Sequence, residues 1–454
     1  MIGNFSLSEL AARLQGQLKG GDANFDAVSI DSRTLASGQL FVAIRGERFD
    51  GHQFIAEAAR KGACGAVVED FAGDGIPQLR VADSLQALGR LGNLNRQRSQ
   101  AKVAAVTGSQ GKTTVKEMLG AILSKAGDTW VTRGNLNNAI GVPLSLIGLE
   151  ARHRYGVFEL GANAAGEIAY SVALVEPAVV ILTNATPTHL EGFGSLDGVV
   201  RAKGEIIDGL AEGGVAVLNA DDPHFNVWAK RAAGRKLVSF GGAEGATYRA
   251  SEVAIGSGGR VQFDLHTPRG VARASLQVLG RHNAMNAAAA AAAAMELGMD
   301  LDTVIRGLAS VRSVRGRMCL LPGQDGATVI DDSYNASPNS FRAAIDLLAE
   351  YRGRRYLIMG DMAEMGSESA AAHAEVGTYA RTRGIDGLWA TGNLSRLAVD
   401  AFGSGGRLFS DQQAMVMACR GILEPSVTLL IKGSRSAAMD KVAEQLTNKE
   451  ASTC

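Results

Sequence analysis

Apolar positions follow two alternating patterns along most of the chain. Short, β-branched apolar runs, typical of buried parallel strands, alternate with longer segments whose apolar residues recur at helical spacing. The clearest case is residues 102–125, where the run Val103–Thr107 precedes a glycine-bounded loop and a segment with helical periodicity. Strands that alternate with helices predict an α/β fold built on doubly wound parallel sheets.

These elements divide the chain into expected domains at residues 1–98, 99–314 and 315–454. Residues 247–279 alternate between apolar and polar positions, so we expect them to form an antiparallel appendage of the central domain. The run of eight alanines after Asn286 predicts a helix packed closely on a sheet. The joint before the last domain is expected at residues 311–318, which hold three arginines and one glycine.

The loop after Thr107 predicts a phosphate-binding site. A strand, a glycine loop, Lys-Thr and a helix make up a P-loop, in which backbone N–H groups and the helix N-terminus attract phosphate oxygens. The usual first glycine is replaced by Val106, so an ordinary strand-to-helix turn is the alternative. That alternative leaves a Lys and two Thr at a helix start unexplained. The candidate nucleotide-binding residues are Gly108, Ser109, Gln110, Gly111, Lys112, Thr113 and Thr114.

A nucleotide bound in a P-loop needs a divalent cation, and the cation needs oxygen ligands. Thr113 is one candidate ligand, and Glu159, near the end of the predicted strand Tyr155–Leu160, is another. His189 follows the next strand and is a third candidate, although a lone histidine is more often a structural hydrogen-bonding residue. The sequence pattern alone favours an exposed helical lysine at Lys203.

Other polar clusters also follow predicted strands. Ser32 and Arg33 lie at a strand end, where α/β units bind ligands, but a solvated loop explains them equally well. In the last domain, residues 331–341, 360–366 and 431–436 each follow a strand. Because parallel strands end at one edge of a sheet, these loops predict a site that faces the P-loop across a cleft. The candidate residues there are Asp332, Tyr334, Asn335, Lys432 and Arg435.

Composition excludes some function classes. Lys+Arg and Asp+Glu balance at 46 each, so nothing indicates a nucleic-acid or membrane-surface partner. The N-terminus lacks a basic segment followed by an apolar one, and the longest apolar tract, Ala287–Met295, is too short to cross a bilayer. We therefore expect a soluble, cytoplasmic protein. We also expect it to act as a monomer, which the composition does not address.

In its motifs the chain resembles the Mur ligases, the ATP-dependent amide-forming enzymes of peptidoglycan synthesis. The family's shorter P-loop, T-G-x-x-G-K-[ST], matches Thr107–Thr113 and accounts for Val106. The resemblance implies a three-domain Mur ligase architecture, with a central P-loop domain and a Rossmann-like C-terminal domain. The other matching motifs are Gly134–Pro143, Glu159–Gly161, Thr183–Ser195, His282–Ala287 and Lys432–Arg435.

The resemblance also narrows the branch of the family. Residues 331–338 and 360–366 are similar to signatures of the branch that adds D-alanyl-D-alanine, except that Ser337 replaces an Asn and Met365 a Leu. The D-N-P-R motif of the branch that adds diaminopimelate or lysine is absent from the sequence. The implied reaction joins UDP-N-acetylmuramoyl-tripeptide to D-alanyl-D-alanine through an acyl phosphate, with ATP converted to ADP and phosphate.

The matching positions imply roles for individual residues. Lys112 is expected to serve the phosphates, and Thr113 with Glu159 to hold a first Mg²⁺. His189 and a carbamylated Lys203 are expected to hold a second Mg²⁺, which replaces the exposed-lysine interpretation. The remaining expectations are adenine at Asn283, ribose at Asp332, phosphates at Arg317, the UDP group at Ser32 and Arg33, the muramoyl-peptide at Asn135 and Asn138, and further substrate contacts at Tyr334, Asn335, Lys432 and Arg435.

Competing interpretations stay open at this point. One is another amide ligase of the superfamily, either an amino-acid-adding Mur ligase or a folylpolyglutamate-type ligase. Folylpolyglutamate-type chains begin close to the P-loop, whereas about 98 residues precede it here. The other is a P-loop regulator without ligase activity, which would leave His189 and Lys203 without a role.

Overall fold

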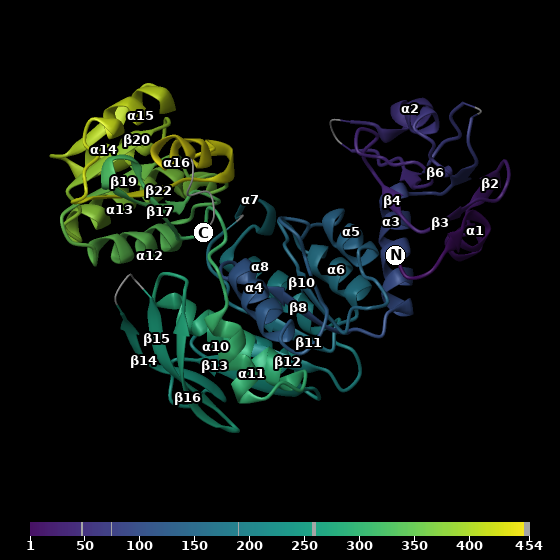
Figure 1. The fold of residues 1–454 in the computed structure, drawn as a ribbon, viewed down its shortest axis with the longest axis horizontal. Helices are drawn as coiled ribbons and strands as arrows, with labels where there is room; N and C mark the ends of the chain where they lie inside the picture. The colour runs from purple at the N-terminus through teal and green to yellow at the C-terminus, as the bar shows by residue number, and fades with distance from the viewer. Residues whose placement is uncertain (47–48, 74, 189, 257–259, 449–454) are drawn as a thin grey trace.

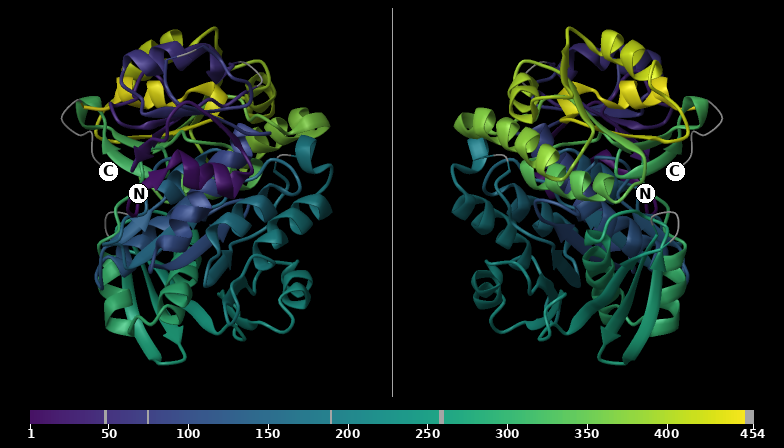
Figure 2. Two further views of the ribbon diagram at one scale, coloured as in Figure 1. Left: turned by 90° about the vertical axis from the view of Figure 1, so that its right-hand side faces the viewer. Right: turned by 90° about the vertical axis from the view of Figure 1, so that its left-hand side faces the viewer.

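The chain forms three units in an arc, with the central unit between the other two (Figure 1). The computed structural model describes residues 1–46, 49–73, 75–188, 190–256 and 260–448. Figure 2 shows the first and last units on the same side of the central unit, with strands β14–β16 at its far side. No helix in these ranges is long and apolar enough to span a membrane.

The first unit is a small α/β sheet with one long helix. Its described strands have the order β2-β7-β6-β5-β4, and β2 is antiparallel to β7 while the other pairs are parallel. A separate pair, β1 with β3, lies beside it. The elements are β1 (Phe5–Ser6), α1 (Leu7–Leu14), β2 (Gln17–Lys19), β3 (Asn24–Phe25), β4 (Val28–Ser29), β5 (Leu40–Val42), η1 (Gly51–Phe54), α2 (Ile55–Arg60), β6 (Gly65–Val68), β7 (Gln78–Arg80) and α3 (Ser84–Arg98).

The central unit is built on a sheet with the strand order β16-β15-β14-β13-β12-β11-β8-β10-β9 in the described residues. Its elements are β8 (Lys102–Thr107), α4 (Lys112–Leu123), β9 (Thr129–Val131), α5 (Gly141–Ile147), β10 (Tyr155–Glu159), α6 (Glu167–Val175), β11 (Val179–Leu182), α7 (Leu190–Phe193), α8 (Leu196–Gly204), η2 (Glu205–Ile207), β12 (Val215–Asn219), α9 (Phe225–Arg231), β13 (Lys236–Gly241), β14 (Tyr248–Ile255), β15 (Val261–Thr267), β16 (Gly270–Leu276), α10 (His282–Glu296) and α11 (Leu301–Ala309).

Helices cover both faces of this sheet, as the alternating pattern predicts. One apolar core lies under α4, α10 and α11, and a second lies under α5, α6, α8 and α9. Strands β14–β16 pair antiparallel with one another, as expected. However, β14 also pairs in parallel with β13. The expected appendage is therefore a continuation of the central sheet, because β14 pairs with β13 as well as with β15.

The alanine run explains how α10 approaches the sheet. All eight residues of Ala287–Ala294 are 0% exposed, and α10 packs on α4 and on strands β12 to β15. A methyl side chain on every side lets the helix lie close to both neighbours at once. The predicted close packing of this helix is confirmed.

The last unit is a mostly parallel sheet with helices on both faces. The order of its described strands is β17-β18-β22-β19-β20-β21, and only β17 runs antiparallel to its neighbour. The sequence patterns did not predict the edge strands β17 and β21, which are short. The elements are β17 (Cys319–Pro322), η4 (Gln324–Gly326), β18 (Thr328–Asp332), α12 (Pro338–Ala349), β19 (Arg354–Met359), η5 (Gly366–Glu368), α13 (Ser369–Thr382), β20 (Gly387–Thr391), α14 (Ser395–Phe402), β21 (Gly406–Phe409), α15 (Gln412–Arg420), β22 (Val427–Lys432), η6 (Arg435–Ala437) and α16 (Asp440–Leu446).

Helix α3 attaches the first unit to the central one. It packs on α5 and α6, and its buried Asn95 amide donates to the backbone oxygens of Leu146 and Leu149 at 2.8 and 3.1 Å. A buried amide that satisfies two carbonyls is costly to remove, because each carbonyl is then left without a donor. The orientation of the first unit is therefore held by polar contacts as well as by apolar packing.

Candidate functional site

A cavity of about 880 Å³ lies between the central and last units. Its lining comes from the P-loop, from residues that follow β10 and β11, from the start of α10, and from the loops after β18 and β22. Sixteen of the predicted site residues line it: Gly108, Ser109, Gln110, Gly111, Lys112, Thr114, Asn138, Glu159, Lys203, Asn283, Arg317, Asp332, Tyr334, Asn335, Lys432 and Arg435. The P-loop and the loops of the last unit thus face the same cavity, and the roles of these residues stay predictions.

The P-loop connects β8 to α4 in a conformation that requires glycine. Gly111 has φ +80°, and an added Cβ would lie 2.6 Å from Asn286 Oδ1. The loop is held from outside, because Asn184 accepts from the backbone N–H of Ser109 and of Gln110, each at 2.9 Å. The Lys112 ammonium donates to the Gly108 carbonyl at 2.7 Å. Lys112 therefore lies folded over the same concavity that a phosphate would enter.

Glu159, the last residue of β10, lies next to the start of α4. Thr113 Oγ1 donates to Glu159 Oε2 at 2.8 Å, and Asn137 Nδ2 donates to Oε1 at 2.8 Å. Only 2% of the Glu159 residue surface is exposed. A hydroxyl and a buried carboxylate at the helix N-terminus form an oxygen-rich donor set of the kind that hard divalent cations prefer.

Lys203, on α8, is buried, so the interpretation of an exposed helical lysine is wrong. It is 1% exposed, and its Nζ lies 3.4 Å from the Ala162 carbonyl and 5.2 Å from the centre of the Phe193 ring. Burial, together with the nearby Lys112 charge, lowers the pKa of Lys203 to about 7. The pattern of α8 did not reveal this, because the residues that cover Lys203 come from other elements.

The last unit contributes a buried ion pair to the cavity. Lys432, at the end of β22, donates to the Asp332 carboxylate and, at 3.0 Å, to the Asn335 carbonyl. The other Asp332 oxygen accepts from the Met318 backbone N–H at 3.2 Å. The Arg317 guanidinium lies 4.3 Å from the centre of the Tyr334 ring. These contacts hold cationic groups at the edge of the sheet that faces the P-loop.

At the start of α10 two asparagines form a chain of hydrogen bonds. Asn286 Nδ2 donates to Asn283 Oδ1 at 2.7 Å, and Asn283 Nδ2 donates to the Leu279 carbonyl at 2.6 Å. Asn286 also lies next to Gly111 of the P-loop. Asn286 thus connects Asn283, which is expected to contact the adenine, to the phosphate loop.

Comparison with known proteins identifies the family. Residues 24–96 match "Mur ligase family, catalytic domain", residues 106–294 match "Mur ligase middle domain", and residues 316–435 match "Mur ligase, glutamate ligase domain". A UDP-N-acetylmuramoyl-tripeptide--D-alanyl-D-alanine ligase of Escherichia coli (strain K12) is 44% identical over 453 residues, which cover 99% of both chains. The chain belongs to the Mur ligase family. The expected resemblance is thereby confirmed.

Solved structures agree with the fold of this Mur ligase. A crystal structure of MurF from Acinetobacter baumannii superposes with a TM-score of 0.92 at 36% identity, covering 98% of this chain and 99% of that one. MurF ligase from Thermotoga maritima, solved in complex with ADP, has a TM-score of 0.84 at 29% identity, covering 92% and 96% of the two chains. The predicted three-domain Mur ligase architecture is confirmed.

Some predicted residues of this Mur ligase lie elsewhere. Thr113 is hydrogen-bonded to Glu159 but does not line the cavity. Asn135 does not line the cavity either, whereas its neighbour Asn137 does. The sequence did place Asn137 in the same loop, but nothing distinguished it from the other asparagines. Its partner Glu159 is 22 residues away, so only the folded chain shows the pair. His189 lies outside the described residues.

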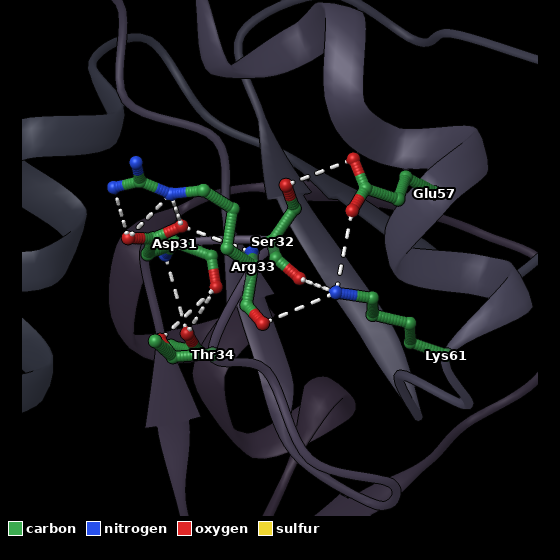
Figure 3. Close-up of polar contacts among 7 residues, drawn as sticks. Asp31, Ser32, Arg33, Thr34, Glu57 and Lys61 are labelled. Carbon is green, nitrogen blue, oxygen red and sulfur yellow. Dashed lines mark hydrogen bonds and ion pairs between the residues drawn. The ribbon is translucent and has the colours of Figure 1, made fainter.

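Ser32 and Arg33 of this Mur ligase lie in the first unit and are not among the residues that line the cavity. Figure 3 shows their polar contacts. Ser32 Oγ donates to Glu57 Oε2 at 3.0 Å, and Lys61 Nζ donates to the Ser32 carbonyl at 2.7 Å. The Arg33 side chain is 84% exposed and pairs with Asp31 at 2.7 Å. Its guanidinium lowers the pKa of the Asp31 carboxyl to about 2. The turn is thus an exposed cluster of charges linked by hydrogen bonds, and the role of Ser32 and Arg33 in substrate binding stays a prediction.

Proposed function

We propose that this chain is an ATP-dependent amide ligase that adds D-alanyl-D-alanine to UDP-N-acetylmuramoyl-tripeptide. The observation that carries the proposal is the single cavity that joins the P-loop to the polar loops of the last unit. Full-length similarity to a UDP-N-acetylmuramoyl-tripeptide--D-alanyl-D-alanine ligase supports the substrate pair. The product, UDP-N-acetylmuramoyl-pentapeptide, serves peptidoglycan synthesis in the cytoplasm, and we expect the enzyme to act as a monomer.

Each unit has a distinct part in this proposal. Residues 1–98 bind the UDP-muramoyl substrate, with Ser32 and Arg33 at the UDP group. Residues 99–314 bind ATP, and residues 315–454 bind D-alanyl-D-alanine together with part of the nucleotide. Asn283 contacts the adenine and Asp332 the ribose, while Asn135 and Asn138 face the muramoyl-peptide.

The chemistry follows from the weakness of a carboxylate as an electrophile. The carboxylate of the tripeptide attacks the γ-phosphate of ATP, which gives an acyl phosphate and ADP. The amine of D-alanyl-D-alanine then attacks the acyl carbon, and the tetrahedral intermediate collapses to the amide and phosphate. Two anions must meet in the first step, so their repulsion has to be offset. Lys112, Arg317, Lys432 and Arg435 supply the positive charge that the cavity directs at the phosphates and carboxylates.

The residues present suit Mg²⁺. Thr113 and Glu159 would hold a first ion, since their oxygens lie 2.8 Å apart at the start of the P-loop helix. A second ion would be held by His189 and by Lys203 once the Lys203 amine carries a carbamate. That modification needs a neutral amine, and a pKa of about 7 for Lys203 leaves much of it neutral at physiological pH. Bound Mg²⁺ supplies neutralisation of the phosphate charge.

Release of phosphate tests the proposal. We expect phosphate to form from ATP only when both UDP-N-acetylmuramoyl-tripeptide and D-alanyl-D-alanine are present. The Thr113→Ala variant serves as the control for contaminating phosphatases. Phosphate release in the absence of both substrates would show that the assigned substrates are wrong. Phosphate release with free diaminopimelate or a folate in place of the dipeptide would show the same.

A further inference from the structure

Lys116 lies one turn into α4 and is a buried cation that the reaction described above leaves unused. Its side chain is 1% exposed, and its Nζ donates to the Thr132 carbonyl at 2.8 Å. The same nitrogen lies 3.0 Å from Glu117 Oε1 and 3.8 Å from Glu159 Oε2. The Lys116 ammonium therefore lies next to the carboxylate of Glu159, a residue that lines the cavity.

Thr132 holds both members of the Lys116–Glu159 pair. While its carbonyl accepts from Lys116, its hydroxyl accepts from the Glu159 backbone N–H at 3.1 Å. Thr132 is itself 2% exposed and lies just after β9. Thr132 thus binds the Lys116 ammonium and the Glu159 backbone, so one buried residue keeps the Lys116 side chain and the end of β10 next to each other.

Glu117 is the nearer carboxylate but the weaker electrostatic partner. The Glu117 side chain is 39% exposed, whereas the Glu159 side chain is 2% exposed. Water screens the charge of an exposed group, while two buried charges interact through a medium of lower effective dielectric constant. The charge of Lys116 therefore acts mainly on Glu159.

We propose that Lys116 is the resident counter-ion of Glu159 and makes metal binding at Glu159 depend on the nucleotide. The proposal rests on the assignment of Glu159 as a Mg²⁺ ligand. Without ATP, the ammonium neutralises the carboxylate and repels a divalent cation, so free metal binds weakly. The phosphates of ATP add negative charge on the other side of the site, and metal then binds together with the nucleotide. Lys116 acts through Glu159, so it is a positioning residue.

Titration of the nucleotide-free, full-length enzyme with Mn²⁺, followed by the electron paramagnetic resonance signal of free Mn²⁺, tests the proposal. Lys116→Gln removes the charge and keeps an N–H donor for Thr132. We expect this variant to bind Mn²⁺ about tenfold more tightly than the wild type, because one like charge near the ion is lost. Glu117→Gln is the matched control, with an affinity within about twofold of the wild type.

Two outcomes overturn different parts of the argument. Equal or weaker Mn²⁺ binding by Lys116→Gln rules out the counter-ion role. If the tighter binding persists in Lys116→Gln/Glu159→Gln, Glu159 is not a metal ligand, and the metal assignment of the proposed function fails as well. If Lys116→Gln does not fold, the double variant decides. It folds if the unpaired Glu159 charge was the cause, which supports the counter-ion role. It stays unfolded if the fold needs the Lys116 side chain itself, which rules that role out.

Discussion

Gln110 of the P-loop donates a hydrogen bond from Nε2 to Ser337 Oγ at 3.0 Å, across the cavity between the central and last units. Both ends are held firmly. The Gln110 carbonyl accepts from Thr183 Oγ1 at 2.5 Å, and Ser337 is the N-cap of α12, in a capping box with Ser340. Ser337 stands where the branch signature has Asn, and the structure gives this residue two contacts that the signature could not reveal.

This contact predicts coupled effects on ATP binding. Gln110→Ala and Ser337→Ala should each raise the KM for ATP about fivefold, the equivalent of a hydrogen bond worth about 1 kcal/mol. The double variant should be no worse than either single one, because both changes remove the same contact. Steady-state kinetics at saturating levels of the other substrates measure this. Ser340→Ala is the control, since it weakens the helix cap but leaves Gln110 with its partner. If the increase in KM for ATP in the double variant equals the product of the two single increases, the two residues act independently.

The pKa of Lys203 predicts a pH dependence for its modification. Burial lowers that pKa to about 7, so the amine is mostly neutral above pH 7 and mostly protonated below it. Only the neutral amine reacts with CO₂. We therefore expect labelling with ¹³C-bicarbonate to give a carbamate resonance that is several-fold stronger at pH 8 than at pH 6, and activity that falls as the pH drops below 7. Lys203→Arg should lack the resonance.

Loss of the Lys203 side chain should abolish activity. We expect no rescue of Lys203→Ala by bicarbonate, because no amine remains to carry the carbamate. A short carboxylic acid in the assay should restore part of the rate by supplying the missing anionic oxygens. Full activity of Lys203→Ala in the absence of any added acid would contradict the carbamate assignment.

The pair of Lys432 and Asp332 predicts a separation of stability from activity. The two residues are 2% and 8% exposed, so Lys432→Met should destabilise the last unit by about 3 kcal/mol by leaving a buried carboxylate unpaired. Asp332→Asn/Lys432→Met should recover most of that stability, measured by urea unfolding, because no unpaired charge remains. Activity should stay low in both variants. Recovery of activity together with stability would mean that the pair only supports the fold.

The alanine run predicts a sharp limit on side-chain size. Ala290→Leu should destabilise the central unit by about 1–3 kcal/mol, because Ala290 is 0% exposed and α10 has no room for larger groups. The midpoint of urea unfolding measures the change. Ala371→Leu, on the exposed side of α13, is the control and should change stability by less than about 0.5 kcal/mol. Equal effects of the two substitutions would show that the packing around α10 is loose.

Much of the fold is readable from local patterns. The run at Val103–Thr107 is a buried strand, and the alanines of α10 are all buried, since periodicity and residue size report directly on burial. The chain direction of parallel strands also places their ends at one edge, which predicts that the loop at Lys112 faces the loops at Asp332 and Lys432. Edge strands such as β17 are less visible, because they are short and half exposed.

The site is only partly readable in the same way. Lys203 looks like a surface lysine within α8, and its burial arises from Phe193 and Ala162, which belong to other segments. Asn137 cannot be told from its neighbours Asn135 and Asn138 until the strand that ends at Glu159 is placed beside it. The sequence gives no indication that Lys116 is important, because its proposed role depends on its short distance from Glu159 in the folded chain.

The sequence by itself thus determined the α/β fold, the phosphate loop and the family, because strand and helix periodicity and short motifs are local properties of the chain. The tertiary structure decided which charges meet. Ion pairing, burial and the pKa of Lys203 depend on separations of a few ångströms between residues far apart in the chain, and Coulomb energy changes steeply over that range in a buried site. The pairs Gln110–Ser337 and Lys116–Glu159 therefore became visible only once the chain was folded.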